Sequence, residues 1–153
     1  MNKEEVAEKI FKWLDFERWK YNINANEPNY FLIYKVDTSE NSGFKVCIEK
    51  IVDRVIILSK IKFSQEDLSN YRLSAEKYKF WIELKTYLIL MNVSTKIEPN
   101  LDELQSIELS KWIYFDGLTQ DKFIDTTTKI TDALDLCKIM WTKFVDSIKS
   151  QNH

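Results

Sequence analysis

The sequence predicts an α+β fold in which long helices cover an antiparallel sheet, in the element order α-β-β-β-β-α-β-β-α. Apolar residues recur at helical spacing near the start, in the middle and at the end of the chain. Between the first two helical segments, four short runs of aromatic and β-branched residues follow one another closely, as in hairpins. With 153 residues, 44% hydrophobic and 30% charged, the chain is expected to form a single domain over residues 1–153.

The first helix is expected at residues 3–16 and is followed by four strands. Asn2 and Glu5 have the spacing of a capping box, in which each side chain accepts a hydrogen bond from the other residue's backbone N–H. The expected strands are residues 19–24, 30–36, 44–49 and 54–63. Gly43 ends a polar turn cluster, residues 37–43, and is expected to be free to take a positive φ.

A long second helix is expected from Ser64 to about Met91, because no Gly or Pro interrupts it. Ser64 and Asp67 have N-capping spacing. Residues 80–91, FWIELKTYLILM, are apolar nearly all round, and a helix of this kind must be covered on several faces. One sheet can cover one face, so a second helix or a second subunit is expected against another.

The last part of the chain is expected to form strands at 93–97 and 104–115 and a helix at about 120–149. Asp116 lies at the turn between strand and helix, where Gly117 permits the turn and Thr119 suits the N-cap. These features favour a structural interpretation of Asp116. A heptad seam runs along the helix through Phe123, Thr127, Ile130, Leu134, Cys137, Trp141, Phe144 and Ile148. A free coiled coil would explain the seam, but a helix laid along the sheet explains it better.

Most catalytic chemistries lack their residues in this sequence. The only histidine is His153, the last residue, so no Ser-His or Cys-His pair and no histidine metal site is expected within the folded body. Two glycines cannot build a phosphate-binding loop. Cys47 and Cys137 fall within apolar patterns and are interpreted as buried thiols. No cofactor and no metal is expected.

Carboxylates are the remaining candidates for catalysis or for binding a small ligand. Glu49 and Asp53 flank a strand bend beside Lys50 and Arg54, and Asp116 is the third choice. A solvated hairpin of mixed charge explains Glu49 and Asp53 better, but a carboxylate-based enzyme or ligand binder stays open as the alternative.

Charge argues against nucleic acid as a partner. The net charge is −2 and the pI is about 5.5, so no overall field attracts polyanions. Weak binding of single-stranded RNA by the sheet stays a further alternative, because basic residues fall on the strands among three aromatic ones. These residues are Lys35, Lys45, Lys50, Arg54, Lys60 and Lys62, with Tyr30, Tyr34 and Phe44.

The predicted location is the cytoplasm, with no membrane partner. No apolar run approaches the ~20 residues that a membrane-spanning helix needs. The first ten residues, MNKEEVAEKI, are charged and periodic, unlike a signal peptide.

The chain resembles an uncharacterised archaeal family of unknown function with a type III secretion chaperone-like fold. The resemblance is carried by residues 63–88 (FSQEDLS through WIELKTYL), by the break after residues 91–93 (MNV), and by IYFDGLTQDKF at 113–123 with the helix that follows. It implies no catalytic residues. Secretion chaperones with this architecture are small, acidic, cytoplasmic homodimers that hold a segment of a partner protein, so the resemblance implies a similar role here.

The leading hypothesis is therefore a non-enzymatic protein that binds another protein and forms a homodimer. It rests on the surplus apolar surface of the second helix and on the absence of catalytic groups. The candidate contacts are aromatic residues, Leu and Met, which are typical of adaptable interfaces. They are Tyr78, Trp81, Tyr87, Leu88 and Met91.

Overall fold

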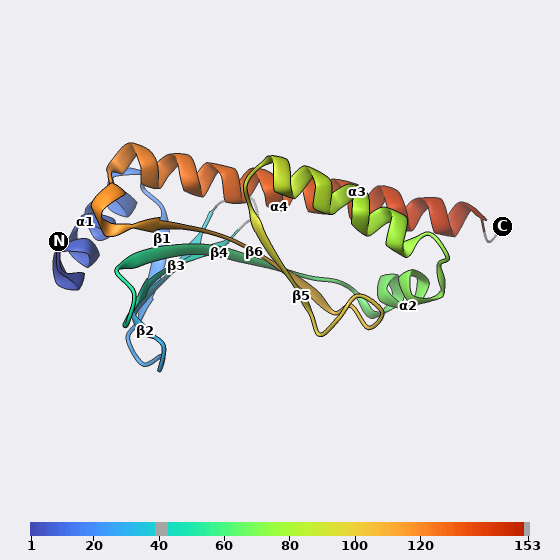
Figure 1. Ribbon diagram of the computed structural model, residues 1–153, viewed down its shortest axis with the longest axis horizontal. Helices are drawn as coiled ribbons and strands as arrows, with labels where there is room; N and C mark the ends of the chain where they lie inside the picture. Colours follow the sequence, from blue (N-terminus) through green and yellow to red (C-terminus); the bar gives the residue numbers. More distant parts are fainter. Residues whose placement is uncertain (39–42, 152–153) are drawn as a thin grey trace. The chain divides into compact units, whose positions relative to one another are not determined.

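The computed structural model describes residues 1–38 and 43–151. Within them the chain alternates helices and strands in the order predicted from the sequence, apart from one helix that is broken in two (Figure 1). The elements are α1 (Lys3–Phe16), β1 (Lys20–Asn24), β2 (Tyr30–Asp37), β3 (Phe44–Glu49), β4 (Arg54–Lys62), α2 (Gln65–Leu73), α3 (Lys77–Leu90), β5 (Ser94–Glu98), β6 (Ser106–Tyr114), the 3₁₀ turn η1 (Phe115–Gly117) and α4 (Gln120–Gln151).

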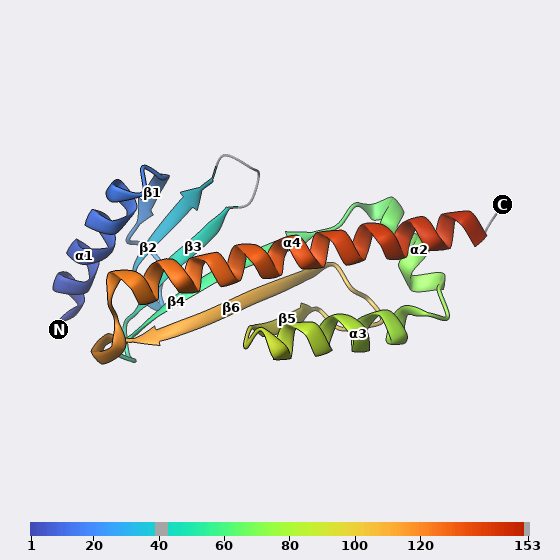
Figure 2. The same ribbon diagram turned by 90° about the horizontal axis from the view of Figure 1, so that it is seen from above.

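The strands form one six-stranded sheet in the order β1-β2-β3-β4-β6-β5. Strands β1 to β4 are an antiparallel meander, which Figure 2 shows for β1, β2 and β3 lying side by side. Tyr34 pairs with Ile23 on one side and with Val46 on the other, and Val46 pairs with Ile57. The predicted α+β class is therefore confirmed.

The second helix is not continuous, which corrects the prediction of one helix from Ser64 to Met91. It divides into α2 and α3 at Ser74, whose backbone is extended with φ −77° and ψ 133°. The Ser74 hydroxyl oxygen accepts a hydrogen bond from the backbone N–H of Glu76 at 3.1 Å. Serine competes in this way with helical hydrogen bonding, so a helix can end without Gly or Pro.

The predicted helix starts are confirmed by their hydrogen bonds. At α1, both halves of the capping box between Asn2 and Glu5 are present. The Ser64 hydroxyl accepts from the Asp67 N–H at 3.2 Å, and the Thr119 hydroxyl accepts from the Lys122 N–H at 3.1 Å. Each bond satisfies an N–H group that the helix itself leaves unpaired.

Gly43 does not take a positive φ, so that prediction is wrong. A Cβ atom at Gly43 would lie 3.1 Å from the carbonyl oxygen of Val36, which makes close approach of the two backbones the reason for glycine here. The neighbouring turn residues 39–42, and also His153, lie outside the described residues.

The described residues that do take a positive φ are Arg18 (57°) and Asn92 (56°), each just after a helix. The N–H groups of Asn92 and Val93 bond to the carbonyls of Ile89 and Leu88, and the corresponding bonds follow α1. This is the Schellman arrangement, which pairs the last carbonyls of a helix.

The chain divides into two compact units. The first comprises Met1–Ser59 and Ser110–Thr131, and the second comprises Lys60–Leu109 and Asp132–His153. The elements β4, β6 and α4 run through both units, and the single domain over residues 1–153 stays a prediction.

The first unit is built around α1, the meander and the start of α4. The Tyr34 hydroxyl donates to the carbonyl of Ala7 in α1 at 2.8 Å, and the rings of Trp13 and Phe123 lie 5.4 Å apart. These contacts join the first helix to the sheet and to α4. Fully buried core residues of this unit include Val6, Ile10, Leu14, Val36, Val46, Ile48, Val55 and Ile57.

The second unit has an aromatic core centred on Trp141 of α4. The Trp141 ring stacks on Phe63 at 3.9 Å and lies 5.6 Å from Tyr71 and 5.9 Å from Phe80. Such ring pairs contribute about 0.5–1.5 kcal/mol each beyond the area they bury. All but one residue of the predicted heptad seam on α4 are buried, and Phe144 is half-buried.

Candidate functional site

Helix α3 has one clearly buried row. Phe80, Leu84 and Leu88 follow one another at intervals of four residues and are 7%, 0% and 0% exposed. Helix α3 contacts β5, and the ammonium of Lys85 approaches the hydroxyl of Thr95 at 3.5 Å. This row anchors α3 in the second unit and decides which of its residues face outward.

The rest of α3 leaves large apolar side chains at the surface. Ile82 is 66% exposed, Ile89 63% and Leu90 76%, while Tyr78 and Tyr87 are about half exposed (49% and 46%). Exposed apolar side chains gathered on one helix are typical of an interaction site, whereas single ones are normal on any surface.

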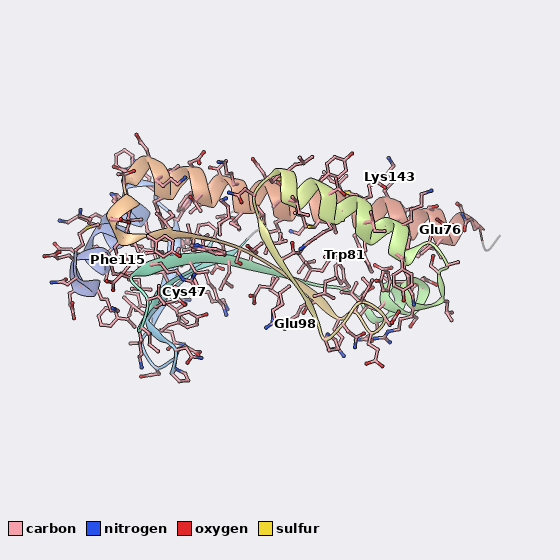
Figure 3. The ribbon with its side chains drawn as sticks, in the orientation of Figure 1. Cys47, Glu76, Trp81, Glu98, Phe115 and Lys143 are labelled. Atoms are coloured by element: carbon pink, nitrogen blue, oxygen red, sulfur yellow. The ribbon has the colours of Figure 1, made fainter. Side chains whose placement is uncertain are left out.

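Two of the predicted contact residues, Tyr78 and Tyr87, lie at this surface. Trp81 and Met91 are half-buried, and Trp81 projects from α3 toward the side on which β5 lies (Figure 3). Leu88 is fully buried, which removes it from any contact surface of this chain, because it continues the row of Phe80 and Leu84.

Ile82, Ile89 and Leu90 are exposed residues of α3 that were not predicted as contacts from the sequence. The spacing of the apolar residues could have indicated this, because these three do not belong to the series with four-residue intervals that forms the buried row. Which row faces inward could not be decided from a segment that is apolar on all sides.

Tyr78, Ile82 and Ile89 form one line along α3, which we name the outer stripe. Their separations of four and seven residues bring all three to the same side of a helix with 3.6 residues per turn. Ile82 and Ile89 are two turns, or about 10 Å, apart along the axis.

Asp102 accepts a hydrogen bond from Tyr78, the N-terminal residue of the outer stripe. The Tyr78 hydroxyl donates to Asp102 Oδ1 at 2.5 Å, and Lys77 Nζ lies 3.2 Å from the same oxygen. The hydrogen bond from Tyr78, and then the bond and charge of Lys77, lower the pKa of Asp102 below its usual range. The carboxylate therefore stays charged near neutral pH and holds the Tyr78 ring in place.

Helix α3 runs beside the later part of α4 (Figure 2). Side chains of these two helices line a groove of about 670 Å³ on the flank of α3 opposite the outer stripe. Its apolar lining comes from both helices: Phe80, Tyr87, Leu136, Ile139, Met140, Phe144 and Ile148. Its polar lining comprises Ser74, Glu76, Lys79, Glu83, Lys143, Ser147 and Gln151. We name this feature the α3–α4 groove.

Stacked aromatic rings form the base of the α3–α4 groove. The rings of Phe80 and Phe144 lie 4.6 Å apart and nearly parallel, and both rings contact Trp141. Ile139 stands at the rim and is 65% exposed. The groove thus offers a preformed apolar base with an exposed apolar edge, as binding grooves do.

The candidate carboxylates each have a partner or face solvent. Glu49 forms an ion pair with Arg54, and Asp53 Oδ1 lies 3.2 Å from Lys3 Nζ. Asp116 is exposed in η1, next to Phe115, whose N–H donates to the carbonyl of Asp53 at 3.0 Å. The backbones at Asp53 and Asp116 are therefore close, but their side chains are those of a solvated surface.

The aromatic residues proposed for stacking RNA are mostly inaccessible. Tyr34 and Phe44 are 2% and 3% exposed, so neither ring can stack on a base. Exposed aromatic residues do occur on β6, at Trp112 and Tyr114, with the Arg54 guanidinium 5.2 Å from the centre of the Trp112 ring. Neither of these two β6 residues was predicted from the sequence as part of a binding surface.

Both cysteines are buried. Cys47 lies in β3 and Cys137 in α4, each 1% exposed. Burial raises the pKa of the Cys137 thiol to about 12, so the reactive thiolate is rare at neutral pH.

Across residues 1–38 and 43–151, no three His, Cys, Asp or Glu side chains are grouped so that they could hold a metal ion. Among the helices described, none combines the length and apolarity needed to cross a membrane.

A family model described as "Uncharacterized conserved protein (DUF2299)" matches residues 6–140. The chain belongs to this family. The resemblance to an uncharacterised family that the sequence analysis stated is therefore confirmed. No curated protein matches this member of the family.

Two of the solved structures compared with this DUF2299 protein share its fold. An uncharacterized protein from Methanothermobacter thermautotrophicus is 22% identical, with a TM-score of 0.75 over 92% of this chain and 96% of its own. YbjN from E. coli, described as a putative transcription regulator, is 12% identical, with a TM-score of 0.51 over 82% of this chain and 86% of its own. The ExsC–ExsE complex gives 12% identity and a TM-score of 0.45 over 65% and 68%. Identities at this level speak for the fold only, and the third TM-score is too low to argue from.

Proposed function

We propose that this DUF2299 protein is a non-enzymatic, protein-binding homodimer of the cytoplasm, and that the outer stripe of α3 joins its two copies. The observation that carries the proposal is the exposure of Ile82 and Ile89, two large aliphatic side chains on one side of one helix. Leaving them in water forgoes the transfer free energy that burial would supply.

The spacing of these two residues makes the outer stripe complementary to itself. In an antiparallel pair of α3 helices with a two-fold axis between Lys85 and Thr86, Ile82 of each copy lies opposite Ile89 of the other. Lys85 lies beside this axis, and its ammonium is directed toward its own chain, 3.5 Å from the Thr95 hydroxyl and over the Trp81 ring. A surface that meets its own copy in this way satisfies the requirement of a closed dimer.

The distribution of carboxylates supports a binding role over an enzymatic one. Glu49 and Asp53 are paired with cations, and Asp116 is exposed, so the three acids are not gathered in an enclosed cleft of the kind that general acid–base catalysis needs. The extended apolar surface instead lies on α3, far along the chain from all three acids.

The mass of the protein in solution tests the proposal. Size-exclusion chromatography with light scattering is expected to give twice the 18.3 kDa of one chain at micromolar concentration. Ile82→Glu combined with Ile89→Glu is expected to give a folded monomer, because the dimer would bury pairs of carboxylates opposite one another. A wild-type protein with the mass of a single chain would refute the dimer.

Ile51→Glu is the matched control for these variants. Ile51 lies in the first unit, which does not contain α3, and is 94% exposed, so it carries the same change of side chain outside α3. Circular dichroism of all variants separates loss of the dimer from loss of the fold.

A further inference from the structure

We propose that the α3–α4 groove binds an amphipathic helix of a partner protein, and that this helix carries basic residues along the flank that faces α3. The inference deepens the proposed function, on which it rests, by naming the kind of partner that the protein would hold. The groove lies on the flank of α3 opposite the outer stripe, so one protein can use both surfaces at once.

The dimensions of the groove fit a helix. Its α3 wall extends from Glu76 to Tyr87, about 17 Å at the rise of an α-helix, and its α4 wall from Leu136 to Gln151 is about 22 Å long. About three turns of a third helix match these lengths. Two neighbouring helices with a channel between them accept such a helix by packing its ridges into the channel.

The lining requires an apolar stripe on the bound helix. Phe80 and Phe144 form the base, and Met140, whose side chain adapts to different shapes, lies beside them. Ile139 at the rim is left 65% exposed until something covers it. Anchors at positions i, i+3 or i+4, and i+7 are the pattern by which a helix fills a groove of this kind.

Rim charges determine which way the bound helix faces. Glu76 and Glu83 are exposed on the α3 wall, two turns apart, and neither forms an ion pair within residues 1–38 and 43–151. Lys79 lies between them and offsets one of the two charges, leaving this wall acidic by one charge. The α4 wall carries Lys143, which is labelled in Figure 3. The ion pairs among residues 1–38 and 43–151 do not include Lys143 either.

A helix with Lys or Arg seven residues apart on one flank and an acid on the other complements both walls. Such rim pairs contribute to orientation and selectivity more than to affinity.

The helical walls argue against an extended peptide. A bound strand derives its affinity from backbone hydrogen bonds to a sheet edge, whereas the N–H and C=O groups of α3 and α4 are already bonded within their helices. The groove can offer side chains only, and a helix, whose own backbone is satisfied, needs nothing more.

The test is a selection from a displayed library of helical peptides about 16 residues long, randomised on their surface, against the purified full chain. Enriched peptides are expected to have two features in common. They should carry apolar residues at i, i+3 or i+4, and i+7, and they should carry basic residues seven positions apart on one flank. Enrichment of peptides without helical periodicity, or no enrichment above a library of helix-breaking peptides, would overturn the proposal.

Variants of the groove then locate the binding of a synthesised, fluorescently labelled peptide. Ile139→Glu is expected to weaken its binding at least about tenfold, as loss of an interface anchor does. Glu83→Lys is expected to weaken it about two- to five-fold, and a peptide with its facing Lys changed to Glu should recover most of that loss. Ile51→Glu, the remote control, should leave it unchanged.

Two other occupants have distinct signatures. If Ile139→Glu abolishes the dimer and no peptide binds, the occupant is a second copy and the helix proposal fails. If dodecanoate displaces an apolar dye from the groove while no peptide is enriched, the groove binds fatty acids and the proposal again fails. Light scattering on the same samples keeps the two proposals apart, because peptide binding by a monomer would refute the dimer alone.

Discussion

The pairing of Ile82 with Ile89 across a two-fold axis is the prediction on which the proposed dimer depends. Ile82→Glu alone is expected to break two contacts in each dimer, because each copy presents its Ile82 to the other's Ile89. Ile89→Lys alone breaks the same two contacts. In an equimolar mixture of the two variants, one contact becomes Glu opposite Lys and the other stays Ile opposite Ile, so a heterodimer should recover.

The size of the effect follows from the exposed fractions. Burying an isoleucine completely is worth about 1.5–3 kcal/mol, and roughly two-thirds of each side chain is available, so each contributes about 1–2 kcal/mol. Ile82→Glu forfeits this contribution in both copies, about 2–4 kcal/mol per dimer, before any cost of burying the charge. At 1.4 kcal/mol per factor of ten, the dissociation constant should rise at least about 30-fold.

Sedimentation equilibrium of each variant and of their mixture measures these constants. The dissociation constant of the heterodimer in the mixture should be at least tenfold lower than that of either variant alone. This corresponds to a difference of about 1.4 kcal/mol in the free energy of association. Equal masses for the mixture and the separate variants would refute the antiparallel register, even if the wild type is a dimer. Adding Ile51→Glu to either variant should change nothing, since Ile51 is 94% exposed outside α3.

Three further predictions concern stability and reactivity. Arg18→Gly should raise the free energy of unfolding by about 1 kcal/mol in urea titrations, because Arg18 holds φ 57°, and Asn92→Gly (φ 56°) should gain less, since asparagine tolerates this region better. Burial raises the pKa of both Tyr34 and Tyr71 from 10.0 to about 12, so the stability they contribute is complete below pH 10 and is lost as the pH rises toward 12. The loss, up to about 3 kcal/mol per tyrosine, should be smaller in Tyr71→Phe when unfolding is measured across this range. Cys137, with a pKa of about 12, should not react with Ellman's reagent near pH 8 until urea unfolds the chain, and rapid reaction in the native state would contradict its burial.

Local features of this protein were predictable where a short-range interaction determines them. The capping box of Asn2 and Glu5 and the cap at Thr119 involve residues only three apart, so the sequence contains both partners. The seam on α4 was predictable because a seven-residue spacing brings its members to one side whatever they pack against.

The break at Ser74 and the conformation of Gly43 were not predictable on the same basis. A serine can end a helix or continue it, and which occurs depends on the contacts of the helices on either side. At Gly43 the sequence shows only that a side chain is missing. The approach of the Val36 carbonyl, which gives the reason, comes from the pairing of β2 with β3.

The candidate site was predictable as a segment but not as a set of residues. Residues 80–91 carry too many apolar side chains for one covering layer, and composition alone shows this. Which of them face outward depends on the row that the second unit buries. That row includes Leu88, which the sequence analysis placed at the surface, and excludes Ile82 and Ile89, which it passed over.

The sequence by itself therefore determined the class of fold, the order of its elements, the capped helix starts and the segment with surplus apolar surface. These follow from periodicity and from hydrogen bonds between near neighbours, which act within a few residues. Only the tertiary structure decided where α2 ends, which flanks of α3 stay exposed and that α3 and α4 enclose a groove. These features depend on how residues far apart in the chain pack together and exclude water. The spacing of residues within one helix does not show which distant residues will pack against it.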